Sequence, residues 1–216
     1  GQNISPLNLN AGSDRITLDL TLDAQKPPVS HGNGGVDQKG PEEGNASYYY
    51  SLTKLNATGT LQVDDTSFDV TGSAWMDREW GTSSLSPDIE GWDWFGLQLS
   101  DGREIMYYRL RTDEAQSSPY SGGSIVLHNG ERISLSMNDV VLEPLEYWTS
   151  PKTNAIYPLS WKFSIPREGI ELIIQPYLNE QELNLTVRYW EGAVQVNGNQ
   201  AGEMLTGNGY AELTGY

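Results

Sequence analysis

Residues Gly91–Arg111 read GWDWFGLQLSDGREIMYYRLR, and this stretch decides the fold. Asp101-Gly102 separates two alternating runs, which is typical of a two-residue turn in a β-hairpin. Such a turn would place Asp93 opposite Leu110 on a largely apolar face. The other face would pair Trp92 with Arg111, Trp94 with Arg109 and Gly96 with Tyr107. The stretch therefore predicts an antiparallel hairpin.

The rest of the chain repeats the period-two alternation of half-buried strands. In Ile16–Asp23 every second residue is Ile or Leu, and Thr or Asp lies between them. Residues 24–45 contain many Pro and Gly and predict a long loop, whereas residues 178–185 are the one weak candidate for a helix. Asn129-Gly130 predicts a second two-residue hairpin turn. Further strands are predicted at residues 47–54, 59–63, 67–72, 124–128, 131–135, 140–142, 159–165, 171–175, 185–196 and 203–213.

About a dozen short strands without crossover helices predict an all-β, antiparallel sandwich or barrel. Ser, Pro and Asp cluster at Ser83–Glu90, just before the strong hairpin. We expect a seam between two domains there, because domain boundaries favour such composition.

The composition excludes several classes of function. Lys and Arg number 13 against 29 Asp and Glu, a formal net charge of −16, so nucleic acid and anionic membranes are unfavourable partners. There is no cysteine and there are only two histidines, so we expect no thiolate chemistry and no multi-histidine metal site. No apolar run approaches the roughly 20 residues of a membrane span, and the first residues show no signal peptide.

Aromatic residues cluster in the middle of the chain, as Tyr48-Tyr49-Tyr50, Trp75, Trp80, Trp92, Trp94 and Tyr107-Tyr108. Bulky rings in a barrel either fill the core or line an apolar ligand cavity. Both interpretations stay open for each residue.

Charges are interleaved with these rings, and strand alternation should bury some of them: Asp77, Arg78, Glu79, Asp93, Arg109 and Glu191. A carboxyl group among aromatic rings has a raised pKa and can act as a general acid. The alternative is a structural network of Arg and carboxylate side chains. No serine-histidine-aspartate arrangement, nucleophile elbow or phosphate loop can be recognised.

Six segments together resemble the AttH and carotenoid 1,2-hydratase family: Tyr48–Leu55 (YYYSLTKL), Gly72–Gly81 (GSAWMDREWG), Gly91–Arg111, Tyr157–Phe163 (YPLSWKF), Tyr189–Gly198 (YWEGAVQVNG) and Gly209–Tyr216 (GYAELTGY). The resemblance implies two packed lipocalin-like β-barrels that join near the Asp-Arg-Glu-Trp segment. It implies a first domain over residues 1–88, part of a barrel, and a second over 89–216. From the resemblance we also expect secretion or a periplasmic location. The sequence itself does not specify the cellular compartment.

The resemblance also implies where this chain departs from the hydratases. They carry a His-x-Trp pattern in the segment that matches residues 77–80, followed by a Tyr and an Asp on a strand. Here Trp80 is kept but Arg78 stands at the histidine position, and arginine does not exchange its proton near neutral pH. The downstream strand offers Tyr107 and Tyr108 without the Asp.

Our first hypothesis is a lipocalin-like enzyme of hydratase, lyase or hydrolase type that acts on a hydrophobic small molecule, such as an isoprenoid, without a cofactor or a metal. The alternative is a non-catalytic protein that binds a lipophilic ligand or assists transport. In the first hypothesis Asp93 is the general acid, and Asp77 or Glu79 is the second choice. The predicted ligand-binding residues are Trp80, Trp92, Trp94, Tyr107, Tyr108, Arg78, Arg109 and Tyr49. We expect no nucleic acid and no membrane insertion.

Overall fold

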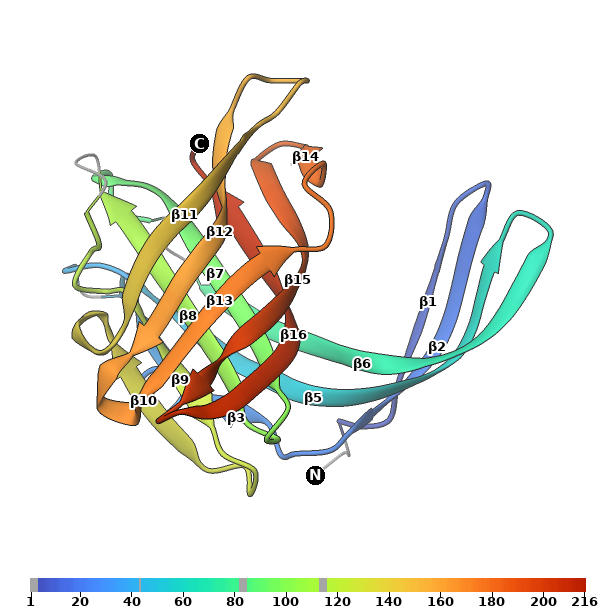
Figure 1. Ribbon diagram of the computed structural model, residues 1–216, viewed down its shortest axis with the longest axis horizontal. Helices are drawn as coiled ribbons and strands as arrows, with labels where there is room; N and C mark the ends of the chain where they lie inside the picture. The colour runs from blue at the N-terminus through green and yellow to red at the C-terminus, as the bar shows by residue number, and fades with distance from the viewer. Residues whose placement is uncertain (1–3, 43, 82–84, 113–115) are drawn as a thin grey trace.

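The computed structural model describes residues 4–42, 44–81, 85–112 and 116–216, which form two antiparallel β-sheets (Figure 1). Two short 3₁₀ turns, η1 (Met137–Asp139) and η2 (Pro166–Glu168), are the helical segments of these ranges. No helix in the described chain has the length and apolar character to cross a membrane. The all-β, antiparallel fold class predicted from the alternation is confirmed.

The first sheet is built around one long strand, β5 (Ala46–Val63), which pairs with β2, β3, β4 and β6. A bulge between Leu52 and Leu55 lets β5 continue through two predicted strands, residues 47–54 and 59–63. The expected long loop over residues 24–45 is wrong in part, because two short segments there pair with β5. The other strands are β1 (Leu7–Gly12), β2 (Ile16–Ala24), β3 (Val29–Ser30), β4 (Val36–Gln38) and β6 (Thr66–Gly81).

The second sheet has the order β10-β9-β8-β7-β16-β15-β13-β12-β11, with β14 added to β15. Among the described residues no ladder joins the edge strands β10 and β11, so the sheet is an open barrel. The candidate helix at residues 178–185 is wrong, because this segment is irregular apart from the short strand β14. The strands are β7 (Ile89–Leu99), β8 (Glu104–Thr112), β9 (Gly122–Val126), β10 (Arg132–Ser136), β11 (Val141–Thr149), β12 (Ile156–Ile165), β13 (Ile170–Pro176), β14 (Glu182–Asn184), β15 (Arg188–Gln200) and β16 (Glu203–Thr214).

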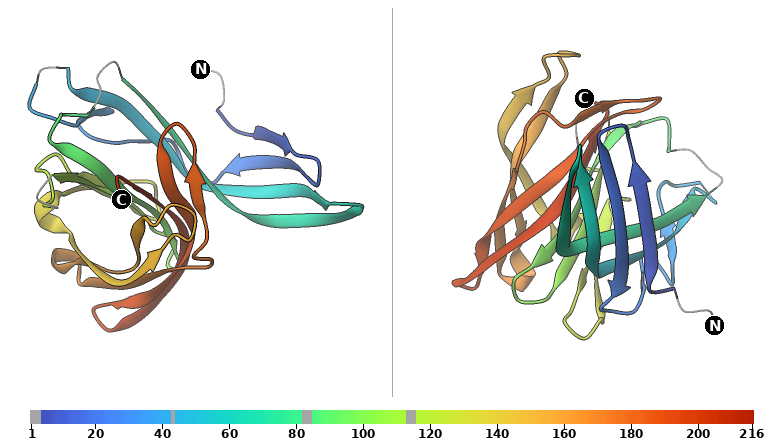
Figure 2. Two further views of the ribbon diagram at one scale, coloured as in Figure 1. Left: turned by 90° about the horizontal axis from the view of Figure 1, so that it is seen from above. Right: turned by 90° about the vertical axis from the view of Figure 1, so that its right-hand side faces the viewer.

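Figure 2 shows the second sheet curled around its own interior, with the first sheet lying against one side of it. One half of β5 and β6 packs on the barrel, and the other half projects away together with β1 and β2 (Figures 1 and 2). The chain changes from one sheet to the other between β6 and β7, although residues 82–84 of the expected seam lie outside the described residues. The division into domains of residues 1–88 and 89–216 stays a prediction.

The register of the β7–β8 hairpin differs by one residue from the prediction. The loop has three residues, because the Leu99 N–H donates to the Arg103 carbonyl and Gly102 adopts a left-handed φ of 80°. A glycine at this position is typical of a turn followed by a bulge. Asp93 therefore lies opposite Arg109 and not Leu110. The Asn129-Gly130 turn has the same three-residue form.

The corrected register sorts the side chains of β7 and β8 between two faces. Asp93 and Arg109 point into the barrel together with apolar residues that fill its interior, among them Phe95, Leu97 and Trp161. Burying an apolar side chain such as Phe95 or Leu97 stabilises the fold by about 1.5–3 kcal/mol. The alternate residues, including Trp92, Trp94, Met106, Tyr108 and Leu110, form the outer face, which packs on β5 and β6.

Candidate functional site

A cavity of about 910 Å³ lies between the two sheets. From the first sheet it is lined by side chains of β5 and β6, and from the barrel by side chains of β7, β8, β15 and β16. Seven of the lining residues are aromatic: Tyr49, Trp75, Trp92, Trp94, Tyr108, Tyr177 and Tyr210. Four are carboxylic acids, namely Asp77, Glu79, Glu191 and Glu212, and Lys39 is the one basic residue among those that line it in the described chain. The cavity thus combines apolar walls with carboxyl groups.

Asp77 on β6 is the most enclosed of the predicted acids that line the cavity. Its Oδ1 accepts hydrogen bonds from the Ser51 hydroxyl at 2.5 Å and the Trp75 indole at 2.6 Å, and its Oδ2 accepts from the Tyr49 hydroxyl at 2.7 Å. Ser51 lies directly opposite Asp77 in the β5–β6 ladder. Burial raises the pKa of Asp77, while the three donors oppose the rise and the charge of Glu79 adds to it. Within the described residues Asp77 forms no ion pair.

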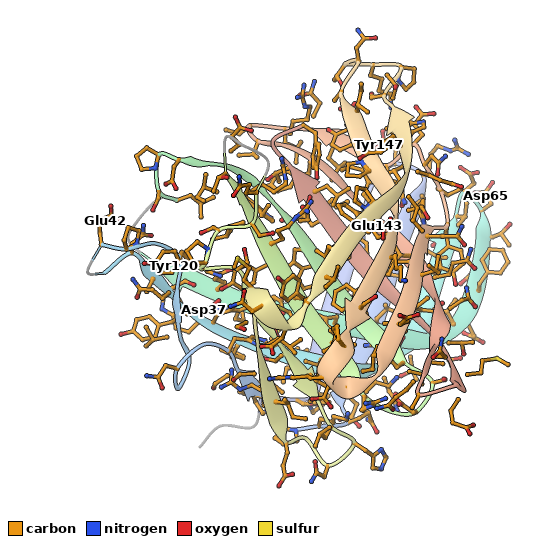
Figure 3. All side chains as sticks on the ribbon, turned by 60° about the vertical axis from the view of Figure 1, so that its left-hand side comes forward. Asp37, Glu42, Asp65, Tyr120, Glu143 and Tyr147 are labelled. Carbon is orange, nitrogen blue, oxygen red and sulfur yellow. The ribbon has the colours of Figure 1, made fainter. Side chains whose placement is uncertain are left out.

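Glu79 has a different environment, although it lies two residues away on the same face of β6. Its Oε1 accepts a hydrogen bond from Ser47 at 2.5 Å and lies 3.2 Å from the Lys39 ammonium. Lys39 also lies 2.7 Å from a carboxylate oxygen of Asp37, which Figure 3 labels, and 3.6 Å from the centre of the Tyr108 ring. Glu79 is therefore the partner of a cation.

Glu212 on β16 is a second carboxyl group with a raised pKa in the cavity, and sequence reasoning missed it. The Trp92 indole donates a hydrogen bond to its Oε1 at 2.5 Å. Burial is the main cause that raises the pKa of Glu212, and the charges of Glu191, Asp77 and Glu79 add to it. Glu191, which the sequence analysis singled out, lies directly opposite Glu212 in the β15–β16 ladder. Period-two alternation in GYAELTGY was the available signal, because it places Glu212 on the opposite face of the strand from Ala211 and Leu213.

The walls of the cavity are held by contacts between rings. The Trp94 indole donates to the Tyr49 hydroxyl at 3.0 Å, and the Trp75 and Trp94 rings meet edge to face at 6.0 Å. Gly96 makes room for the Trp94 ring, because a Cβ at this position would lie 2.3 Å from the indole. Burial raises the pKa of Tyr49 and Tyr108 well above its usual value, so both hydroxyls stay protonated.

Asp93 lies outside the cavity, on the inner face of the barrel. Its Oδ2 accepts two hydrogen-bond contacts from Arg109, at 2.7 and 2.6 Å, and its Oδ1 accepts from the Tyr216 hydroxyl at 2.6 Å and lies 3.5 Å from Arg111. The structure thus separates Asp93 and Arg109 from Asp77 and Glu79, which had been expected in one site. Asp93 lies outside the cavity because it alternates along β7 with Trp92 and Trp94, which face the cavity, and the register then pairs it with Arg109.

Three other predicted ligand contacts also lie elsewhere. Trp80 is 52% exposed and stacks on Tyr48, and Arg78 is exposed on the same outer face of β6. Strand alternation explains this, because residues 78 and 80 face away from residues 75, 77 and 79. Tyr107 points into the barrel, where it packs on Phe163. The cavity therefore contains Tyr49, Trp92, Trp94 and Tyr108 from the predicted set.

The fold and this cavity define an antiparallel, lipocalin-like β-barrel protein with an aromatic cavity that carries carboxyl groups. The AttH-like family model matches residues 1–216, and the chain belongs to this family. The family resemblance expected from the sequence is confirmed.

Among proteins of known function, the chain is similar to kievitone hydratase of Fusarium solani subsp. phaseoli, with 25% identity over 224 residues. The match covers 98% of this chain and 60% of the relative. The crystal structure of a candidate AttH from Nitrosomonas europaea has a TM-score of 0.87 and 31% identity, covering 96% of this chain and 64% of that one. Kievitone hydratase from Nectria haematococca has a TM-score of 0.80 and 23% identity, covering 97% and 64%, and supports the fold. The chain thus spans less than two thirds of the length of these relatives.

Proposed function

We propose that the chain contributes a hydratase-type active site that adds water to a carbon–carbon double bond of a hydrophobic small molecule. The similarity to kievitone hydratase supports the reaction type. The observation that carries the proposal is the environment of Asp77, a buried carboxyl group in an aromatic cavity whose hydrogen-bond partners are all uncharged donors. Because its pKa is raised, such a group holds its proton to a higher pH than an exposed aspartic acid does and can deliver it as a general acid.

The proposed reaction needs an acid and a base in opposite protonation states. Asp77 donates its proton to one carbon of the double bond, and a carbocation develops on the other carbon. The faces of Trp75 and Trp94 stabilise this positive charge through their ring quadrupoles. Water adds to the cation, and the Glu212 carboxylate accepts the proton that the water loses. Exchange with solvent then restores both carboxyl groups.

The carboxyl groups around the cavity favour the developing positive charge. Glu191 and Glu212 lie on the barrel side, and Asp77 and Glu79 on the side of the first sheet. A carbocation between them experiences attraction from the groups that are ionised, and the low-polarity walls strengthen this attraction. A hydrophobic substrate enters because the lining is mainly apolar and includes seven aromatic side chains.

The test is turnover of kievitone and of linear isoprenoids by the purified full chain, followed by mass spectrometry for the gain of one water. We expect Asp77→Asn to abolish turnover and to keep ligand binding, measured by quenching of tryptophan fluorescence. Asp69→Asn is the matched control, because Asp69 lies on the same strand but is exposed outside the cavity. Unchanged turnover in Asp77→Asn would refute the assignment of the acid.

Ligand binding without chemistry is the second candidate function. The observation that favours it is Arg78, which stands where the resembled hydratases carry histidine and cannot act as an acid or base. This candidate predicts stoichiometric, saturable quenching of tryptophan fluorescence by a lipophilic ligand that is recovered unchanged after long incubation.

A further inference from the structure

His31 is a buried histidine behind the cavity, and the proposed reaction does not use it directly. Its side chain is 1% exposed and lies just after β3, between the two sheets. Its Nε2 lies 2.7 Å from the Ser51 hydroxyl of β5, and its Nδ1 lies 3.1 Å from the Ser124 hydroxyl of β9. Ser51 in turn donates to Oδ1 of Asp77 at 2.5 Å. Four side chains therefore form one continuous row, Ser124–His31–Ser51–Asp77.

The row has a definite direction when Asp77 is ionised. The single hydroxyl proton of Ser51 is donated to the Asp77 carboxylate, so Ser51 must accept a hydrogen bond from His31. His31 then carries its proton on Nε2, and its Nδ1 accepts from the Ser124 hydroxyl. Every donor and acceptor along the row has a partner in this state.

The three hydrogen bonds of the row can run in the opposite direction when Asp77 is protonated on Oδ1. The acid then donates to Ser51, Ser51 donates to Nε2 of His31, and His31 carries its proton on Nδ1 and donates to Ser124. The row gains one proton, taken from water in the cavity, and the imidazole keeps a single N–H. Both nitrogens of His31 face hydroxyl groups, which are able to donate or to accept.

The surroundings keep the imidazole neutral in both states. Burial lowers the pKa of His31 to about 3, and the positive charges of Arg132 and Lys39 add to this effect. Arg132 is held beside it by donation to the Gly32 carbonyl at 2.9 Å. The Tyr49 ring lies 4.5 Å from the imidazole, and Glu79 is the charged group that acts on Asp77 from the cavity side.

We propose that His31 is a positioning residue, whose change of tautomer lets Ser51 donate to the ionised Asp77 and accept from the protonated Asp77. The role of Asp77 as the acid rests on the proposed function, whereas the coupling between the two side chains does not. A hydrophobic side chain in place of His31 would serve the ionised state alone, because Ser51 would lack an acceptor when Asp77 is protonated.

The first test measures the tautomer directly and needs no substrate. In protein labelled with ¹⁵N-histidine, two-bond ¹H–¹⁵N couplings identify the protonated nitrogen of His31, and exposed His128 is the internal control. The Trp75 indole N–H, which donates to Asp77, reports the titration of Asp77 in the same sample. We expect the His31 proton to move from Nε2 to Nδ1 as Asp77 is protonated, and the change to disappear in Asp77→Ala. A proton that stays on one nitrogen, or a doubly protonated ring, would overturn the proposal.

The second test compares two variants whose effects on the pH profile of kcat have opposite signs. In His31→Phe the protonated form of Asp77 loses support, so the basic limb moves to lower pH by about one unit. In Ser51→Ala the carboxylate loses a donor, so the limb moves to higher pH by a similar amount. His31→Gln keeps a donor and an acceptor and should restore the limb in part. If both variants lost kcat without opposite shifts of the basic limb, His31 would have a structural role and the proposal would be refuted. If neither the wild type nor any variant turned over substrate, the proposed function would be refuted. The spectroscopic test would then decide the role of His31.

Discussion

Replacing Asp93 by Ala should destabilise the protein strongly, because two arginines are held around this carboxylate inside the barrel. The Asp93 side chain is 0% exposed, and those of Arg109 and Arg111 are 14% and 7% exposed. Without Asp93 both guanidinium groups lose their buried counter-charge, and the Tyr216 hydroxyl loses its acceptor. Burial raises the pKa of Tyr216, with a further contribution from Asp93, so its hydroxyl remains a donor at neutral pH.

The expected loss is about 3–5 kcal/mol, the usual cost of removing one partner from a buried ion pair. This is a large fraction of a total stability of about 5–15 kcal/mol. For a chain of this length it corresponds to a decrease in Tm of roughly 6–20 °C. Asp93→Asn should cost less, because the amide oxygen still accepts one hydrogen bond.

Urea unfolding at pH 7, followed by near-UV circular dichroism, measures the loss. The matched control is Asp64→Ala, because Asp64 also contacts an arginine, Arg15, at 2.8 and 2.9 Å but on the surface. Solvent screens this exposed pair, so its removal should change unfolding little. If Asp93→Ala were as mild as Asp64→Ala, the reasoning on the buried network would be refuted.

Three further variants test other parts of the structure. The raised pKa of Asp77 means that its contribution to stability is present below its unfolded pKa and is lost as pH rises through its folded pKa. Asp77→Asn should therefore gain stability relative to wild type as pH rises above about 4, and a relative loss in urea unfolding would contradict this. Lys26→Met should cost about 3–5 kcal/mol at pH 8, because it leaves the buried Glu104 carboxylate without the Lys26 ammonium that lies 2.7 Å away. Burial raises the pKa of Glu104, so the cost should decrease as pH falls toward 5, and equal costs at pH 8 and pH 5 would refute this. Gly96→Ala should displace the Trp94 ring and change tryptophan fluorescence and ligand affinity together, whereas an unchanged spectrum would show that the ring does not depend on the glycine.

Much of the fold could be predicted because strand alternation is a local property. The Leu residues of β2 recur at every second position, and both hairpins lie where Asp-Gly and Asn-Gly were found. The exact loop length was not predictable from the dipeptide, because the same glycine suits a two-residue turn and a three-residue turn with a bulge. Tertiary packing selects between the two forms.

The candidate site was predicted only in part, for two separate reasons. The alternation in WMDREW already separates Trp80 from Asp77, so this error could have been avoided from the sequence. The contacts of His31 could not, since Ser51 and Ser124 are 20 and 93 residues away along the chain. Such pairs are brought together by the packing of the sheets, which no local pattern encodes.

One additional residue in the β7–β8 loop determines whether Asp93 can act as an acid. With a two-residue turn, Asp93 would face Leu110, and a carboxyl group buried without a cation would hold its proton. The three-residue loop places Arg109 opposite Asp93 and so makes Asp93 a partner of buried cations. Strand alternation in β7 places Trp92 and Trp94 on the opposite face from Asp93, where they meet Glu212 and Tyr49 in the cavity. Asp77, held by three uncharged donors, is the predicted acid that retains the surroundings a general acid needs.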